Sequence, residues 1–300
     1  MVPFRINRLL IALRTHHADA GPRHRRSVSP SRNGAPAVDV VSRETMKTEC
    51  FYHPLWPIIY EDNHLLGLYK PAGLLVQGDR TGEASLLDLG KKWLKECCGK
   101  PGKVFLAMVH RLDRPVAGVV LFCRTSKAAA RISAQFRSGR IRKHYLAVAE
   151  GDVTPSAGRL VNQLERHDER SSVIVAEATP RSREARLSYR VLDVAGSRSL
   201  LEIELETGRH HQIRLQLAHL GFPILGDLRY GASAPLPGRQ VALFATQLEL
   251  EHPTRKESLL LRCPLPQSWP WPSTREETGA PPWNWSELEP LLDPGSGTSM

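Results

Sequence analysis

The feature that most constrains the fold is a series of short apolar runs of strand length in the middle of the chain. Many are rich in Val, Ile, Leu and Tyr, which suit half-buried strands. Helical periodicity is confined to residues 85–96, 126–138 and 209–220. Because strands and helices do not alternate regularly, we expect an α+β fold with a mixed, largely antiparallel sheet flanked by helices, not a doubly wound parallel sheet. The expected strands lie at residues 58–60, 65–69, 119–123, 141–149, 185–192, 200–205 and 241–250.

Local signals predict where several of these elements begin and end. Asp62 and Asn63 predict the turn of the first hairpin. Ser85 and Ser126 are the predicted N-caps of the first two helices, because a serine hydroxyl accepts a hydrogen bond from a free amide of the first turn. Gly139 is expected to end the second helix.

The two ends of the chain differ in composition from this middle part. Residues 1–51 lack hydrophobic periodicity and contain no lysine before Lys47. Three interpretations fit them: sequence translated upstream of a true start at Met46, an organellar presequence, or a disordered basic arm. The missing lysine favours the first. Residues 267–300 are rich in Pro and Trp, and we expect an extended tail whose tryptophans dock on the domain. One domain is expected at residues 52–266.

The charge of the chain points to a polyanionic partner. The net charge is +10, and residues 46–265 alone carry +9, from 32 Lys and Arg against 23 acids. The basic character therefore belongs to the expected domain and not only to an end. Nucleic acid is the commonest polyanion that such a surface attracts.

Several classes of protein are disfavoured. The five cysteines form no CxxC pair, which fits reduced thiols and a cytoplasmic location, or a mitochondrial one if residues 1–45 are a presequence. No run is long and apolar enough to span a membrane, so no membrane partner is expected. We also expect no metal and no cofactor, since the chain lacks zinc-ligand spacing, a P-loop and a GxGxxG fingerprint.

The stretch with the clearest chemical content is His-Arg-Leu-Asp-Arg at residues 110–114, which leads into an apolar strand. Asp113 stands between Arg111 and Arg114, and these guanidinium groups predict ion pairs that keep the carboxylate charged. Gly118 predicts the close approach of another backbone, because glycine has no Cβ. From composition alone, a surface loop of ion pairs fits equally well.

The sequence of this stretch resembles the central motif of the RluA family of RNA pseudouridine synthases. Four further blocks resemble that family in the same order along the chain, and the similarity spans about residues 56–266. The blocks lie at residues 60–76, 135–147, 206–231, and 251–254 with 264–266.

The resemblance implies an enzyme that isomerises specific uridines to pseudouridine in structured RNA, either rRNA or tRNA, as a monomer. The reaction breaks the C1′–N1 bond, turns the detached base and rejoins it through C5. In the family the aspartate at the position of Asp113 is essential, and the arginine at Arg214 pairs with it. Tyr145 matches the aromatic that stacks on the target base. Arg111 matches the arginine that fills the space left by the flipped nucleotide.

Further residues are expected to contact RNA. Lys70 is expected either to contact the RNA backbone or to support the floor of the site. Arg137, Arg140, Arg142 and Lys143 lie just before Tyr145 and form either a phosphate track or the charged edge of a strand. The predicted RNA-binding residues are Arg111, Arg114, Lys70, Arg209, His211, Arg140, Arg142 and Lys143.

Some positions depart from the family pattern. Gln216 stands where the family often has histidine, and Gln77 and Phe244 also differ from the usual residues. These departures bear on substrate preference. An alternative function is a non-catalytic RNA-binding or RNA-folding protein on the same scaffold. The joint presence of Asp113, Arg214 and Tyr145 argues against it, because a binder has no need of those three residues together.

Overall fold

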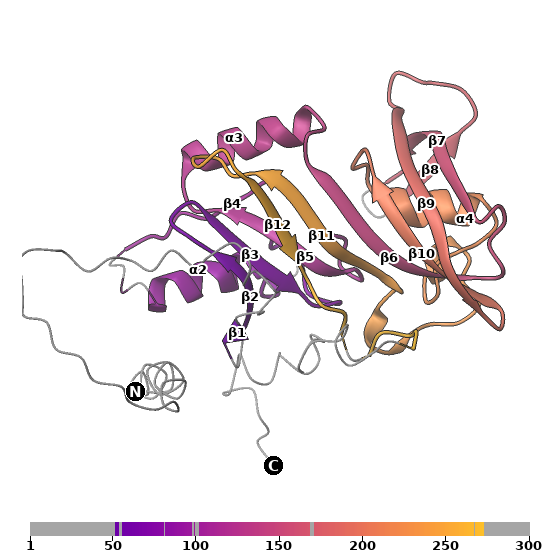
Figure 1. Cartoon of the computed structure of the whole chain (residues 1–300), viewed down its shortest axis with the longest axis horizontal. Coiled ribbons are helices and arrows are strands. Elements are labelled where there is room, and N and C mark those ends of the chain that lie inside the picture. Colours follow the sequence, from indigo (N-terminus) through magenta and orange to yellow (C-terminus); the bar gives the residue numbers. More distant parts are fainter. Residues whose placement is uncertain are drawn as a thin grey trace, which may run out of the picture. The chain divides into compact units, whose positions relative to one another are not determined.

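The computed structural model describes residues 52–53, 56–80, 82–97, 99, 102–168, 171–266 and 268–272 (Figure 1). The expected extension at residues 1–51 and most of the expected tail at 267–300 lie outside these residues. Among the described residues, no helix is long and apolar enough to cross a membrane.

The described residues form a twelve-stranded sheet in the order β1-β2-β3-β5-β11-β6-β10-β9-β7-β8, with β12 paired to β11 and β4 paired to β5. All pairs are antiparallel except β5 with β11, so the prediction of a mixed, largely antiparallel sheet is confirmed. The strands are β1 (Tyr52–His53), β2 (Trp56–Glu61), β3 (Leu65–Lys70), β4 (Ala107–Met108), β5 (Ala117–Cys123), β6 (Arg142–Glu150), β7 (Ala157–Arg166), β8 (Ser172–Val175), β9 (Arg183–Ala195), β10 (Arg198–Leu205), β11 (Leu243–Glu251) and β12 (Ser258–Arg262).

Three α-helices flank this sheet in the described part of the chain: α2 (Leu86–Cys97), α3 (Ser126–Arg137) and α4 (Gln212–His219). Figure 1 shows α2 and α3 beside the half of the sheet that holds β2 to β5, and α4 beside β7 to β10. Two short 3-10 helices, η1 (Leu228–Tyr230) and η2 (Pro237–Arg239), follow α4.

The predicted helix starts are partly confirmed. Ser85 caps α2, since its Oγ accepts a hydrogen bond from the Asp88 amide at 3.3 Å. Ser126 is not the cap of α3: Thr125 is extended and its Oγ1 accepts from the Ala128 amide, so the prediction was one residue late. The predicted start of the last helix at residue 209 was three residues early, because His211 has a left-handed backbone that a helix cannot include.

The core lies along the central strands. Every residue of β3 and of β5 is buried, as expected for strands covered on both faces. Trp269 and Trp271, from the expected tail, are buried against this core, and the Trp269 ring meets Phe244 edge-on at 6.0 Å. The predicted docking is therefore confirmed for these two tryptophans, while Trp283 and Trp285 lie outside the described residues.

Gly118 joins the two strands of the parallel pair. It lies opposite Ala245 of β11, with a φ of 130°. A Cβ at this position would lie 2.4 Å from the carbonyl oxygen and 2.5 Å from the amide nitrogen of Ala245. The predicted close approach of another backbone is confirmed, and it fixes the loop before β5 against the centre of the sheet.

Candidate active site

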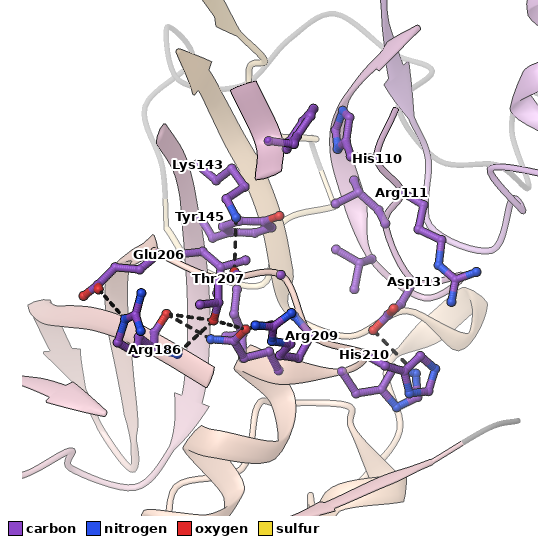
Figure 2. A pocket seen from close by; sticks show the side chains of 18 of the residues that line it. His110, Arg111, Asp113, Lys143, Tyr145, Arg186, Glu206, Thr207, Arg209 and His210 are labelled. Atoms are coloured by element: carbon purple, nitrogen blue, oxygen red, sulfur yellow. Dashed lines mark hydrogen bonds and ion pairs between the residues drawn. The ribbon is translucent and has the colours of Figure 1, made fainter. Parts of the chain in front are cut away.

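A pocket of about 770 Å³ opens beside the loop that precedes β5 (Figure 2). It is walled by this loop, the end of α3, the start of β6 and the segment that runs from β10 into α4. The lining residues are 109–113, 116, 136–139, 143, 145, 186, 205–214 and 243. The fold thus brings together at the pocket three of the sequence blocks that carry the family resemblance, those at residues 110–114, 135–147 and 206–231.

Lys70 holds the loop that carries Asp113 in place through hydrogen bonds to its backbone. Its side chain is fully buried, and its Nζ donates hydrogen bonds to the carbonyls of Pro71, Arg114 and Val116 at 3.0, 3.0 and 2.6 Å. Burial lowers the pKa of Lys70 to about 7, and the Asp113 carboxylate acts against that shift. The side chain therefore lies beneath the Asp113 loop, where it supports that loop, and its ammonium group has no exposed surface for the RNA contact that was the other expectation.

Arg214 connects Asp113 to a second, buried carboxylate. Its Nη1 donates to Asp113 Oδ2 at 3.2 Å, while Nε and Nη2 donate to the two oxygens of Asp227 at 2.6 and 2.8 Å. Arg214 is 4% exposed and Asp227 1%. Such a bidentate pair fixes the plane of the guanidinium group. The predicted pairing of Arg214 with Asp113 is confirmed, whereas Asp227 was missed as a site residue, although it lies in the motif block at residues 206–231.

The two arginines that flank Asp113 in sequence do not pair with it. Arg114 turns away from the pocket, donates to the Gly73 carbonyl at 2.8 Å and forms an ion pair with Glu83. Arg111 lines the pocket, is exposed, and forms no ion pair with a described residue. The predicted ion pairing from both neighbours is therefore wrong, because the direction that each arginine takes from this loop depends on partners elsewhere in the fold, such as Glu83 and the Gly73 carbonyl for Arg114. The cation on Asp113 comes from α4.

Two histidines lie at the start of α4 beside Asp113. Their rings stack at 3.8 Å, and both line the pocket. His211 Nε2 lies 3.6 Å from Asp113 Oδ2, and its Nδ1 lies 2.7 Å from the hydroxyl of Tyr230. His210 Nδ1 meets Ser172 Oγ at 3.0 Å. The placement of His211 near the reacting region agrees with its selection from the sequence, while Tyr230 was missed.

Tyr145 and Lys143 stand on one wall of the pocket, on the same face of β6 (Figure 2). Tyr145 is 8% exposed, and burial together with the Asp113 charge raises its pKa. Lys143 Nζ donates to the Thr207 carbonyl at 3.1 Å, and burial, with a smaller effect of Arg209, lowers its pKa to about 8. Both side chains thus form one wall of the pocket, beside the segment that leads into α4.

The remaining predicted cations differ in their pairing. Arg142 is bound to Glu204 at 3.1 Å and to Glu249 at 3.8 Å. Arg140 meets only the Ser138 hydroxyl, at 3.1 Å, and forms no ion pair within the described part of the chain. Arg209 lines the pocket and donates to the Glu184 carbonyl at 2.9 Å.

A buried amide network shapes the loop that leads into α4. Gln212 Oε1 accepts from Thr207 Oγ1 at 2.7 Å and from the Arg209 amide at 3.0 Å. Its Nε2 donates to Gln216 Oε1, and Gln216 Nε2 donates to Asn162 Oδ1 at 2.7 Å. The departure at Gln216 is therefore accommodated by an amide partner on β7. This support of the pocket wall was not evident from the sequence.

Comparisons with known proteins agree with this geometry. The family described as RNA pseudouridylate synthase matches residues 64–219, more than half of the 300-residue chain. Ribosomal large subunit pseudouridine synthase D of Nitrosomonas europaea is 32% identical over 245 residues, which cover 78% of this chain and 69% of that protein. The tRNA pseudouridine synthase C of Salmonella typhi is 32% identical over 243 residues, which cover 71% of this chain and 86% of that protein.

A solved structure extends the agreement to the fold. Human RNA pseudouridylate synthase domain containing 4 superimposes with a TM-score of 0.60 at 28% identity, covering 71% of this chain and 89% of that chain. The expected α+β fold and the resemblance drawn from the sequence motifs are thereby confirmed.

Proposed function

The chain belongs to the RNA pseudouridylate synthase family, and from that premise we propose that Asp113 is the carboxylate with which it isomerises uridine to pseudouridine. The observation that carries the proposal is the contact of Asp113 with Arg214 at 3.2 Å within a pocket of about 770 Å³. A carboxylate that accepts a hydrogen bond from a buried guanidinium group, itself fixed by a second carboxylate, keeps one orientation.

The reaction defines what each residue must do. The C1′–N1 bond breaks, the base turns, a C5–C1′ bond forms, the C5 hydrogen leaves as a proton and N1 gains one. Asp113 supplies the negative charge, as nucleophile or base toward the nucleotide. Tyr145 offers a flat apolar surface for stacking on the base. Arg111, exposed at the pocket, takes the place of the flipped nucleotide in the RNA.

The substrate that we propose is a structured RNA, either rRNA or tRNA. The two relatives carry names that refer to the ribosomal large subunit and to tRNA respectively. The rival function, RNA binding without catalysis, is not favoured, because the Asp113–Arg214–Asp227 arrangement fixes a charge that binding does not require. Mapping pseudouridine across the RNA of cells with and without the gene tests the proposal. Sites that vanish and return on complementation support it, whereas unchanged maps contradict it.

RNA phosphates are best contacted by arginines that have no carboxylate partner. Arg137 lines the pocket, Arg140 follows it, and neither forms an ion pair with a described residue. Arg142 is neutralised by Glu204 of β10 and Glu249 of β11, the two strands that flank β6 inside the sheet, so it lies neither on a free strand edge nor open to phosphate. We place the phosphate track on Arg137 and Arg140, which revises the expectation for Arg142.

Replacement of Arg137 and Arg140 together by Ala should weaken RNA binding and flatten its dependence on salt. Each lost phosphate contact lowers the slope of log K against log salt by about 0.7–0.9. Arg198→Ala is the matched control: Arg198 is exposed and forms no ion pair in the described part, but lies at the opposite end of β10 from the pocket-lining Leu205. Equal slopes for the double variant and the control would place the track elsewhere.

The affinity for RNA should also fall as the pH rises from about 7 to about 9. Lys143 has a pKa of about 8, so its charge is present below this pH and is lost above it. Lys143→Arg keeps a positive charge throughout this range, because the guanidinium group does not titrate there. Binding titrations at three pH values check the prediction. The same loss of affinity in Lys143→Arg would assign the pH dependence to another group.

A further inference from the structure

His211 has an unusual backbone at the start of α4. Its φ of 56° and ψ of 24° lie in the left-handed region, which residues with a Cβ rarely adopt. Among the described non-glycine residues only Lys256 also has a positive φ. Such conformations persist where surrounding contacts hold them, and they occur often at functional sites. Here the imidazole lines the pocket, with Nε2 3.6 Å from Asp113 Oδ2.

Tyr230 determines which nitrogen of His211 carries hydrogen. Its hydroxyl oxygen accepts a hydrogen bond from the Ser172 amide at 3.2 Å and lies 2.7 Å from His211 Nδ1. No other described group accepts a hydrogen bond from this hydroxyl, so we assign its single proton to a bond toward Nδ1. The hydrogen of a neutral imidazole then sits on Nε2, which faces Asp113.

Burial keeps the imidazole of His211 neutral. Burial lowers the pKa of His211 to about 3, Arg214, His210 and Arg229 act in the same direction, and the Asp113 carboxylate opposes them. A neutral imidazole has one N–H, so its tautomer decides whether Asp113 receives a donor or faces a lone pair. The hydroxyl of Tyr230 favours the tautomer that presents an N–H donor to Asp113.

The side chains of Arg214 and His211 face the same oxygen of the Asp113 carboxylate, Oδ2. Arg214 Nη1 donates to Oδ2 at 3.2 Å, and His211 Nε2 is nearest to Oδ2 as well. Oδ1 receives no donor from the residues that the structure describes. The two carboxylate oxygens therefore differ: Oδ2 faces Arg214 and His211, whereas Oδ1 is open to a ligand in the pocket.

We propose that His211 is a positioning residue for Asp113, and that Tyr230 makes it one by fixing the tautomer with hydrogen on Nε2. This rests on the proposed catalytic role of Asp113. The Nε2–H and the Arg214 guanidinium group together anchor Oδ2, and Oδ1 is the atom presented to the nucleotide. The role differs from the RNA contact expected for His211 from the sequence.

The first test is Tyr230→Phe, which removes the hydroxyl and keeps the ring that lies 5.1 Å from the Arg214 guanidinium carbon. The probe is an in vitro transcript of the host's large-subunit rRNA or tRNA, labelled with tritium at uridine C5. Release of tritium is measured in single turnovers with enzyme in excess. The rate should fall about 10-fold, as when an outer hydrogen-bond partner is lost, with unchanged affinity for the transcript.

Two variants of His211 separate positioning from folding. In Asn the amide sits at the place of Nδ1, and asparagine tolerates the left-handed backbone. In Gln the amide reaches the place of Nε2 and can donate to Asp113, but the backbone is less favourable. His211→Gln should therefore react faster than His211→Asn, although His211→Asn should be the more stable to heat. If His211 only supported the fold, the variant that is more stable to heat, His211→Asn, would also be the one that reacts faster.

A double-mutant cycle completes the test. The glutamine amide has a fixed donor and needs no tautomer selection, so Tyr230→Phe should slow His211→Gln much less than it slows the natural protein. Equal slowing in both backgrounds, a wild-type rate for Tyr230→Phe, or a wild-type rate for His211→Asn overturns the inference. Failure of the proposed function looks different: the natural protein then releases no tritium, or Asp113→Asn releases it at the normal rate.

Discussion

Asp113→Asn should reduce the rate of pseudouridine formation by roughly 1,000-fold or more, since the reaction loses its charged carboxylate. The change is nearly isosteric. Arg214 keeps its bonds to Asp227 at 2.6 and 2.8 Å, so no buried cation is left unpaired. The variant should therefore unfold at the same temperature as the natural protein and bind the transcript at least as tightly. Single-turnover kinetics, thermal unfolding and binding assays check these three expectations.

Asp152→Asn is the matched control for this experiment. Asp152 is exposed and lies outside the lining of the pocket, so the same chemical change there should leave the rate unaltered. A normal rate in Asp113→Asn would remove Asp113 from catalysis. A slow Asp113→Asn that also unfolds early would instead point to a structural role for the carboxylate.

Gly118→Ala should lower the free energy of unfolding by about 3 kcal/mol or more, because strain and overlap act together. The new Cβ would lie 2.4 Å from the Ala245 carbonyl oxygen, on a backbone with a φ of 130°. Since this contact joins β5 to β11, the change forces the Asp113 loop away from the centre of the sheet. Urea denaturation at a constant m-value measures the loss of stability.

Gly139→Ala separates strain from overlap. Gly139 also has a positive φ, of 69°, but a Cβ there would meet nothing within 4 Å. This substitution should cost only about 1 kcal/mol, the strain of a left-handed alanine. If both variants unfold at the same urea concentration, the close approach of the two backbones does not contribute to stability.

From the sequence, the fold class, the three helices, seven of the twelve described strands and the family could be predicted. Apolar runs of strand length predicted these seven strands, because the side chains of a strand pack against the core from one or both of its faces. The absence of a Cβ at Gly118 predicted a close backbone approach without naming the partner. The motif around Asp113 and the block that holds Arg214 were recognisable in the sequence, so these two residues could be expected to pair although they are separated by 101 positions.

The three-dimensional structure was needed to show which charged side chains are free, which form ion pairs and which are buried. Arg114 forms an ion pair with Glu83, and Arg142 forms ion pairs with Glu204 and Glu249. Lys70 is buried and donates hydrogen bonds to backbone carbonyls. Adjacent residues of one loop take partners from different elements, and the local sequence does not contain those partners. The positive φ of His211 likewise depends on what surrounds it. The physical reason is that ion pairing and burial depend on distances in space, whereas propensity and periodicity depend on neighbours along the chain.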